Sequence, residues 1–169
     1  MKKISLRIKE ILNINKISSA PVDLEKVAKG FGVKIEYSKL ENDISGFLYL
    51  KDKTPIIFVN KLHPITRQRF TIAHELGHLI LNHQGDLFVD KGSILFRNTH
   101  SQNGIVKEER EANRFAAELL MPEEILLKEF IENEIDIENA DQLNKLANKF
   151  EVSTQALTIR LTNLGWSFF

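Results

Sequence analysis

Apolar residues recur at helical spacing along most of the chain. At the N-terminus Ile4, Ile8 and Ile11 share one face, and Pro21 begins a second amphipathic segment that ends in glycines. A proline closes the strongly helical segment 105–121. We therefore expect seven helices, at residues 1–19, 21–32, 63–83, 105–121, 123–132, 140–150 and 153–164.

Three short segments instead have the character of β-strands. Residues 33–37, 46–50 and 56–60 are rich in β-branched and aromatic residues, and polar turns separate them. Residues 82–104 show no clear periodicity and contain three glycines, which is typical of a long loop. The sequence therefore predicts an α+β fold that is mostly helical and has a small sheet of about three strands.

Composition narrows the class of protein. The 169 residues are 43% hydrophobic and 27% charged, as in globular proteins with a sizeable core. The charges of the 23 basic and 23 acidic residues cancel, which argues against a protein whose main partner is nucleic acid or an anionic membrane. The absence of cysteine excludes a disulfide framework, a thiolate metal site and a cysteine nucleophile. No apolar run approaches membrane-spanning length, so we expect a cytoplasmic protein.

The segment TIAHELGHLILNH, residues 71–83, places polar side chains in an otherwise apolar helix. His74 and His78 are four residues apart, so both imidazoles can point at one position, and neutral imidazole is a good zinc ligand. Glu75 is too far round the helix to bind the same metal easily, but it can reach a water molecule there. Such a pattern also arises by chance. In a buried helix, however, each polar group without a partner would cost about 1–3 kcal/mol, so a metal that satisfies these side chains is the favoured interpretation.

A third ligand is available on the helix at 105–121. A catalytic zinc ion needs three protein ligands and one open position. Glu108, Glu109 and Glu111 are the candidates. All three acids would also suit a helix N-terminus, where negative charge interacts well with the helix dipole.

Glu109 is the predicted ligand among these three. It shares a stripe with Asn113 and Ala116, whereas Glu111 lies about 200° round the helix and should face away. The small residues Ala112 and Ala116 would let this helix approach the histidine helix closely. Asn113 could then accept a hydrogen bond from a ligand histidine and fix its tautomer.

Several long segments resemble the ImmA/IrrE family of zinc metallopeptidases. They are PVDLEKVAKGFGVKIEY, SGFLYL, RQRFTIAHELGHLILNH, EREANRFAAELLMP and LANKFEVSTQALTIRLTNLG, in the order of the family and from about Pro21 to Gly165. The resemblance implies a gluzincin-like core and a ligand at the first glutamate of EREAN, which is Glu109. It also implies site-specific cleavage of a helix-turn-helix repressor encoded nearby, which releases stress or mobile-element genes.

The predicted function is therefore that of a zinc-dependent endopeptidase acting on a protein partner. His74, His78 and Glu109 would hold one zinc ion, or another divalent metal, and Glu75 would act as general base. A non-catalytic metal-binding regulatory or interaction module is the alternative, but a purely structural metal site has no need of Glu75.

Two parts of this mechanism stay open in the sequence. The group that holds the oxyanion could be any one of His83, His100, Tyr37 and Tyr49. A substrate chain is expected to lie extended against an edge strand, which we place at residues 46–50.

The C-terminal part has the cadence of a helix-turn-helix. We divide the chain into a metallopeptidase core, residues 1–122, and a C-terminal helical segment, residues 123–169, packed on it. The segment 123–169 holds 4 basic and 9 acidic residues, and its last helix offers only Arg160 as a cation. Because DNA affinity comes largely from phosphate contacts, we expect no direct DNA binding but packing or partner recognition.

Overall fold

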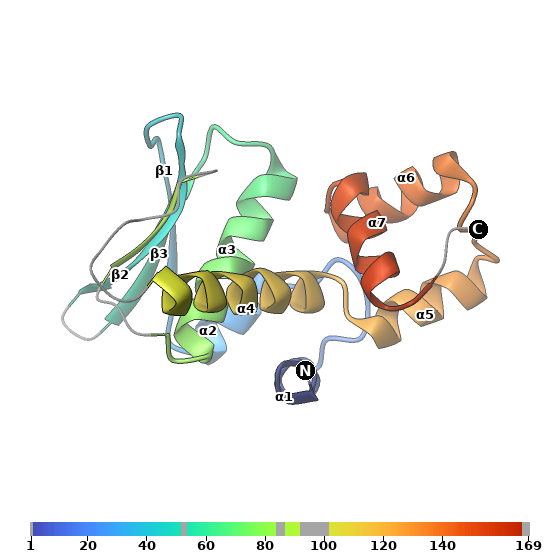
Figure 1. Ribbon diagram of the computed structural model, residues 1–169, viewed down its shortest axis with the longest axis horizontal. Helices are drawn as coiled ribbons and strands as arrows, with labels where there is room; N and C mark the ends of the chain where they lie inside the picture. The colour runs from blue at the N-terminus through green and yellow to red at the C-terminus, as the bar shows by residue number, and fades with distance from the viewer. Residues whose placement is uncertain (1, 52–53, 84–86, 92–101, 167–169) are drawn as a thin grey trace. The chain divides into compact units, whose positions relative to one another are not determined.

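The protein is described by a computed structural model, which covers residues 2–51, 54–83, 87–91 and 102–166. The chain forms two compact units (Figure 1). One unit is Leu24–Ala116, and the other combines Met1–Asp23 with Ala117–Phe169. The seven expected helices are all present, and the α+β class is confirmed.

The unit Leu24–Ala116 contains a four-stranded sheet in the order β1-β3-β2-β4. Its strands are β1 (Lys34–Ser38), β2 (Ile44–Lys51), β3 (Thr54–Asn60) and β4 (Leu87–Lys91). β1 runs parallel to β3, whereas β2 is antiparallel to both β3 and β4. The three expected strands are present, and the fourth lies inside the segment 82–104 that we expected to be a loop. β4 was not predicted because a strand of five residues is too short to show a clear pattern in the sequence.

The expectation that residues 46–50 form an edge strand is wrong. These residues belong to β2, and Phe47 pairs with Phe58 of β3 on one side and with Val89 of β4 on the other. Among the described strands, β1 and β4 are the edges of the sheet. The error follows from the missed fourth strand, because β2 would be an edge without it.

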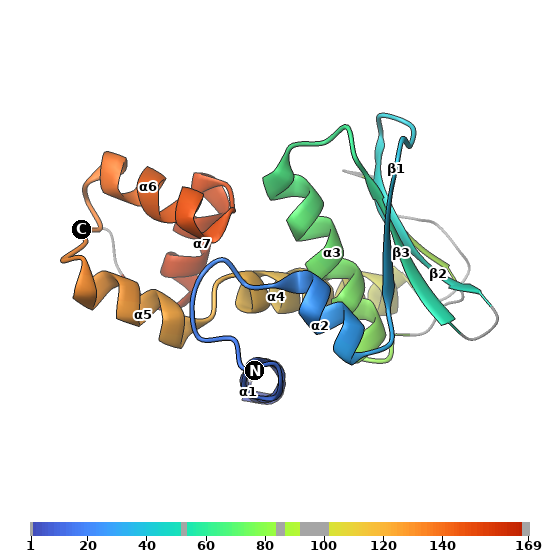
Figure 2. The same cartoon turned by 180° about the vertical axis from the view of Figure 1, so that it is seen from behind.

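Helix α3 (Ile65–Ile80) packs on this sheet and contacts β2, β3 and β4. Figure 2 shows α3 beside the sheet, together with α2 (Leu24–Gly30), which contacts both α3 and β1. Gly46 allows the close approach of β2, because a Cβ atom there would lie 2.6 Å from the Thr71 methyl group. Burial of apolar side chains such as Leu76 then fixes the helix on the sheet.

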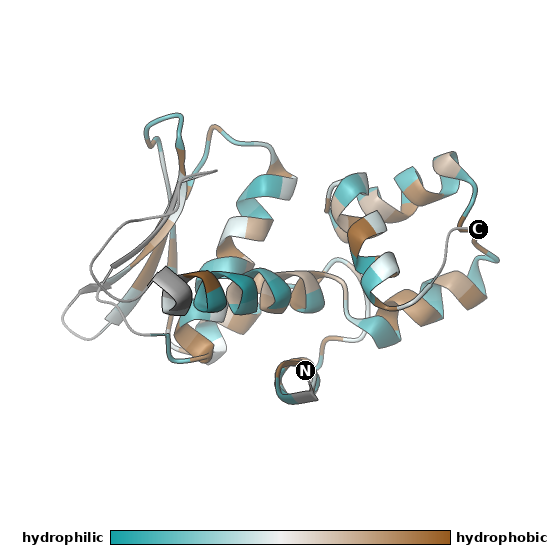
Figure 3. Ribbon diagram, viewed as in Figure 1, coloured by the Kyte–Doolittle hydropathy of each residue, from teal (hydrophilic) through white to brown (hydrophobic). Residues whose placement is uncertain are grey.

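The other unit is entirely helical within its described residues. It contains α1 (Lys2–Ile14), α5 (Glu123–Glu132), α6 (Ala140–Phe150), α7 (Thr154–Asn163) and the end of α4 (Gln102–Leu120). Hydrophobic and hydrophilic residues occupy different sides of these helices (Figure 3). The predicted division at residues 122 and 123 differs from this one in two ways: α1 belongs with the C-terminal helices, and the boundary falls inside α4. The buried face of α1, which includes Ile8 and Ile11, accounts for its place in this unit.

The expected helix-turn-helix cadence is confirmed in α6 and α7. Glu151 adopts a left-handed conformation with φ of 53° and ends α6. Two residues later the Ser153 hydroxyl caps α7 by accepting a hydrogen bond from the Ala156 N–H at 3.1 Å. This turn is tight enough to bring the two apolar faces together. In the described part of the chain, no helix has the length and apolar character needed to cross a membrane.

Candidate metal centre

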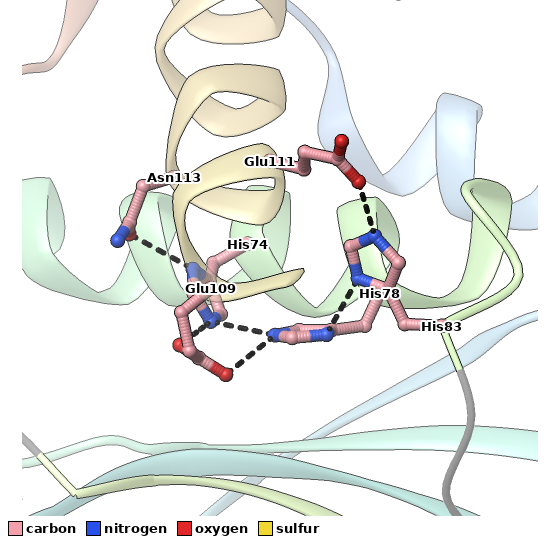
Figure 4. A network of polar contacts seen from close by, with 6 residues as sticks. All are labelled: His74, His78, His83, Glu109, Glu111 and Asn113. Carbon is pink, nitrogen blue, oxygen red and sulfur yellow. Dashed lines mark hydrogen bonds and ion pairs between the residues drawn. The ribbon is translucent and has the colours of Figure 1, made fainter. Parts of the chain in front are cut away.

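Two histidines of α3 face a common point. His74 and His78 lie one helical turn apart, and their Nε2 atoms are 3.0 Å from each other (Figure 4). Both side chains are buried, with 5% and 1% of their surface exposed. The i, i+4 spacing of the sequence therefore produces the arrangement that it predicts.

Glu109 reaches the same point from helix α4. Its Oε2 atom is 3.4 Å from the His74 Nε2, and its Oε1 atom is 3.3 Å from the His78 Nε2. The three donor atoms that His74, His78 and Glu109 offer lie within 4.8 Å of one another, which suits a single metal ion. The structure thus brings together the three residues predicted as ligands.

Small residues allow α3 and α4 to approach closely enough for this arrangement. A Cβ atom at Gly77 would lie 3.2 Å from the Ala112 Cα and 3.2 Å from the Phe115 ring. Ala112 and Ala116 are both fully buried. Gly77 is thus the counterpart of the small alanines that the sequence marked on α4. A larger side chain at position 77 would push α4 outward and carry Glu109 away from the histidines.

Asn113 supports His74 as the sequence predicts. Its Oδ1 atom lies 3.1 Å from the His74 Nδ1. Since a carboxamide oxygen only accepts, the His74 Nδ1 carries the proton in this contact. The Nε2 of a neutral His74 then presents a lone pair to Glu109 and His78, as a metal ligand must.

Glu75, the predicted general base, is fully buried on α3. Its neighbours in sequence, His74 and Leu76, are also buried. The carboxyl group therefore belongs to the interior of the unit that holds the three donor atoms. Its catalytic role stays a prediction.

His83, one of the four oxyanion candidates from the sequence, lies beside His78. We considered it as a group to hold an oxyanion. Its Nδ1 atom instead lies 3.0 Å from the Nδ1 of His78, and its Nε2 atom lies 3.3 Å from Glu111 Oε2 (Figure 4). His83 therefore contacts the ring edge of His78 that is remote from Glu109. Glu111 faces away from the three donor atoms, as expected from its position on α4.

The other oxyanion candidates do not join the cluster in the described structure. Tyr37 donates a hydrogen bond to Glu25 Oε1 at 3.1 Å, and burial together with this contact raises the pKa of Tyr37 to about 12. Tyr49 lies on β2 with 43% of its surface exposed. His100 lies outside the described residues.

The cluster favours the protonation states that metal binding needs. Burial lowers the pKa of the His78 imidazole, and the contact with Glu109 offsets this only in part. Burial raises the pKa of the Glu109 carboxyl, but its contacts with the imidazoles of His74 and His78, which donate to it when they are protonated, outweigh burial and hold that pKa well below its usual range. A neutral imidazole and an ionised carboxylate are both ready to act as ligands at neutral pH.

Comparison with known proteins agrees with this picture. Residues 28–162 match the model of a peptidase family described as the IrrE N-terminal-like domain. The fold is similar to that of a Mycobacterium tuberculosis transcriptional regulator, with a TM-score of 0.66 and 16% sequence identity over 96% of this chain. The match covers 47% of that regulator, so this chain spans about half its length. No curated protein matches the sequence significantly.

Proposed function

The chain belongs to the peptidase family of the IrrE N-terminal-like domain, and on this basis we propose that it is a zinc-dependent endopeptidase. One observation carries the proposal: the donor atoms of His74, His78 and Glu109 lie within 4.8 Å of one another. Two imidazole nitrogens and one carboxylate form a donor set of catalytic zinc sites. Because His74 turns a lone pair toward Glu109, a cation among these atoms would relieve the repulsion between them.

In the proposed mechanism Glu75 is the general base and then the general acid. Zinc, when bound by His74, His78 and Glu109, supplies Lewis acidity, which lowers the pKa of a water molecule and polarises a peptide carbonyl. The Glu75 carboxylate accepts a proton from the attacking water as the new C–O bond forms. It then delivers that proton to the leaving nitrogen as the C–N bond breaks. Asn113 holds the His74 ring in the tautomer that leaves its Nε2 unprotonated.

The proposed substrate is a helix-turn-helix transcriptional repressor, whose cleavage would relieve repression of stress or mobile-element genes. The family resemblance of the sequence supports this choice. The substrate chain would bind in extended form along the outer edge of β4, which ends the described sheet and contacts α3. β2 cannot serve, because both of its edges are already paired.

Replacing Glu75 by glutamine tests the catalytic part of the proposal. Glu75→Gln removes the base and leaves the three ligands in place, so cleavage of a repressor encoded beside this gene should fall at least about 100-fold. The same preparation should keep its zinc, measured by elemental analysis. Glu108→Gln makes the same chemical change at a residue outside the cluster and should cleave normally.

Two results would contradict this function. Cleavage at the wild-type rate by zinc-loaded Glu75→Gln would remove Glu75 from the mechanism. A zinc-loaded wild-type protein that binds the repressor but leaves it intact would instead favour the alternative of a metal-binding regulatory module.

A further inference from the structure

We propose that His83 and Glu111 are positioning residues that fix the tautomer of His78 and so keep its Nε2 lone pair directed at the metal centre. The inference rests on the proposed function, because it concerns the same cluster. It assigns roles to two residues that the mechanism above does not use. We call the chain of contacts from His78 through His83 to Glu111 the histidine relay.

The end of helix α3 places His83 beside His78. Asn82 has a φ of 56°, in the left-handed region that ends many helices. The His83 N–H then donates to the His78 carbonyl at 3.0 Å, and the Asn82 N–H donates to the Leu79 carbonyl at 3.2 Å. These two bonds form a Schellman motif, which turns the chain back over the last helical turn. Backbone geometry therefore delivers the His83 ring to the His78 ring.

The direction of the hydrogen bonds in the relay follows from its outer end. Glu111 Oε2 lies 3.3 Å from the His83 Nε2, and an ionised carboxylate only accepts. The His83 Nε2 therefore carries a proton, and the Nδ1 of neutral His83 is an acceptor. At 3.0 Å from it, the His78 Nδ1 must be the donor. The Nε2 of neutral His78 is then left with a lone pair, facing Glu109.

The relay does for His78 what Asn113 does for His74. In both cases an acceptor on the Nδ1 side leaves the Nε2 free, but one group suffices for His74 and two are needed for His78. His83 is nearly as buried as the ligand it supports, with 5% of its side chain exposed. Such an interior position suits a group that holds a ring in place. Groups that orient metal ligands typically change metal affinity 10- to 100-fold when they are removed.

Three substitutions and one control substitution separate the tautomer role from simple packing. His83→Phe keeps an aromatic ring but has no acceptor, so zinc affinity should fall about 10- to 100-fold. His83→Gln can accept through its carbonyl and donate through its amide nitrogen, so affinity should recover to within about threefold of wild type. Glu111→Ala removes the outer end and should give an intermediate loss. Lys107→Ala, which removes only the 3.9 Å ion pair to the other oxygen of Glu111, should leave affinity unchanged.

Zinc affinity is measured by competition with a chromophoric chelator, without any peptide substrate. Long-range proton–nitrogen NMR of the histidine rings in the metal-free protein provides a second, independent readout. Wild type should show His78 protonated at Nδ1, and His83→Phe should show a mixture of tautomers or protonation at Nε2. Packing alone would not produce that change.

The outcomes separate the relay from the proposed function. Unchanged His78 tautomer and unchanged zinc affinity in His83→Phe would overturn the relay, as would a glutamine variant as weak as the phenylalanine variant. If wild type bound zinc but cleaved nothing, the proposed function would fail while the affinity series still decided the relay. If wild type bound no zinc, the NMR measurement on the metal-free protein would decide it.

Discussion

Both units of this protein bury polar side chains, but they do so in opposite ways. The helical unit, Met1–Asp23 with Ala117–Phe169, buries Glu129 and Arg160. The unit Leu24–Ala116 buries His74, Glu75 and His78. The presence of buried polar side chains therefore does not distinguish the two units, but the chemistry of their contacts does.

In the helical unit each of these charges meets a complementary group. Arg160 donates from Nε to the Met121 carbonyl at 3.1 Å and has Glu118 at 3.9 Å. Glu129 accepts from Lys149 at 2.5 Å. In both cases a donor faces an acceptor, which is how buried polar groups stabilise a fold. This also explains why Arg160, the cation on α7, serves packing.

In the metal centre groups of the same kind face each other. The two Nε2 atoms are 3.0 Å apart, and with both histidines held as donors at Nδ1 they offer two lone pairs. A carboxylate, also an acceptor, completes the group. Acceptors that converge without a donor repel one another, so neutral His74 and His78 beside an ionised Glu109 favour the binding of a cation between them. The comparison teaches that mismatched polarity, more than burial itself, distinguishes the site from the scaffold.

The largest expected effect is the loss of zinc affinity when one of the proposed ligands is removed. Glu109→Ala removes one of three ligands and should weaken zinc binding by more than about 100-fold, since even supporting residues commonly contribute that much. Glu108→Ala, one residue earlier on α4, should bind as wild type. Chelator competition measures both variants. Full zinc binding by Glu109→Ala would show that the third ligand lies elsewhere.

The next largest effect is a loss of stability in the helical unit with no change in zinc affinity. Arg160→Ala removes the donor to the Met121 carbonyl and a cation 3.9 Å from the buried Glu118, so it should lower the free energy of unfolding by about 3 kcal/mol. Lys145→Ala, an exposed change in the same unit, should stay within about 0.5 kcal/mol. Urea denaturation measures both, and zinc affinity should not change in either. Weakened zinc binding in folded Arg160→Ala would show that the two regions are not independent.

Acid should destabilise the metal-free protein through protonation of His78 and Glu109. His78 has a lowered pKa in the folded state, so the unfolded state binds more protons as the pH falls below the ordinary value of 6.5. The lowered pKa of Glu109 acts in the same direction below its ordinary value of 4.5. Stability should therefore decline from pH 7 to pH 5 and again below about pH 4.5. Urea midpoints across this range measure the decline, and the first step should be smaller in His78→Gln.

The smallest expected effect concerns DNA. The C-terminal segment 123–169 carries 4 basic and 9 acidic residues, and its buried Arg160 is engaged by Met121. Fluorescence anisotropy with a duplex of about 20 base pairs should therefore show no binding below about 10 μM at low salt. Submicromolar binding with a steep salt dependence would mean that α6 and α7 contact phosphates.

The sequence by itself determined the parts of this protein that depend on local periodicity. A helix fixes the relation between residues four apart, so the pairing of His74 with His78 and of Glu109 with Asn113 could be derived from spacing alone. The same rule excluded Glu111 from the ligands. The helical spacing of apolar residues likewise located the seven helices, and short β-branched and aromatic segments located three of the four strands.

Tertiary structure decided whatever depends on partners distant in sequence or on a single backbone angle. β4 is recognisable only by its pairing with β2, and that pairing also moved residues 46–50 from the edge to the interior of the sheet. The place of α1 in the unit of the C-terminal helices depends on packing of its buried face against residues distant in sequence, which local periodicity does not specify. His83 depends on the left-handed turn at Asn82, a conformation that asparagine tolerates but does not require.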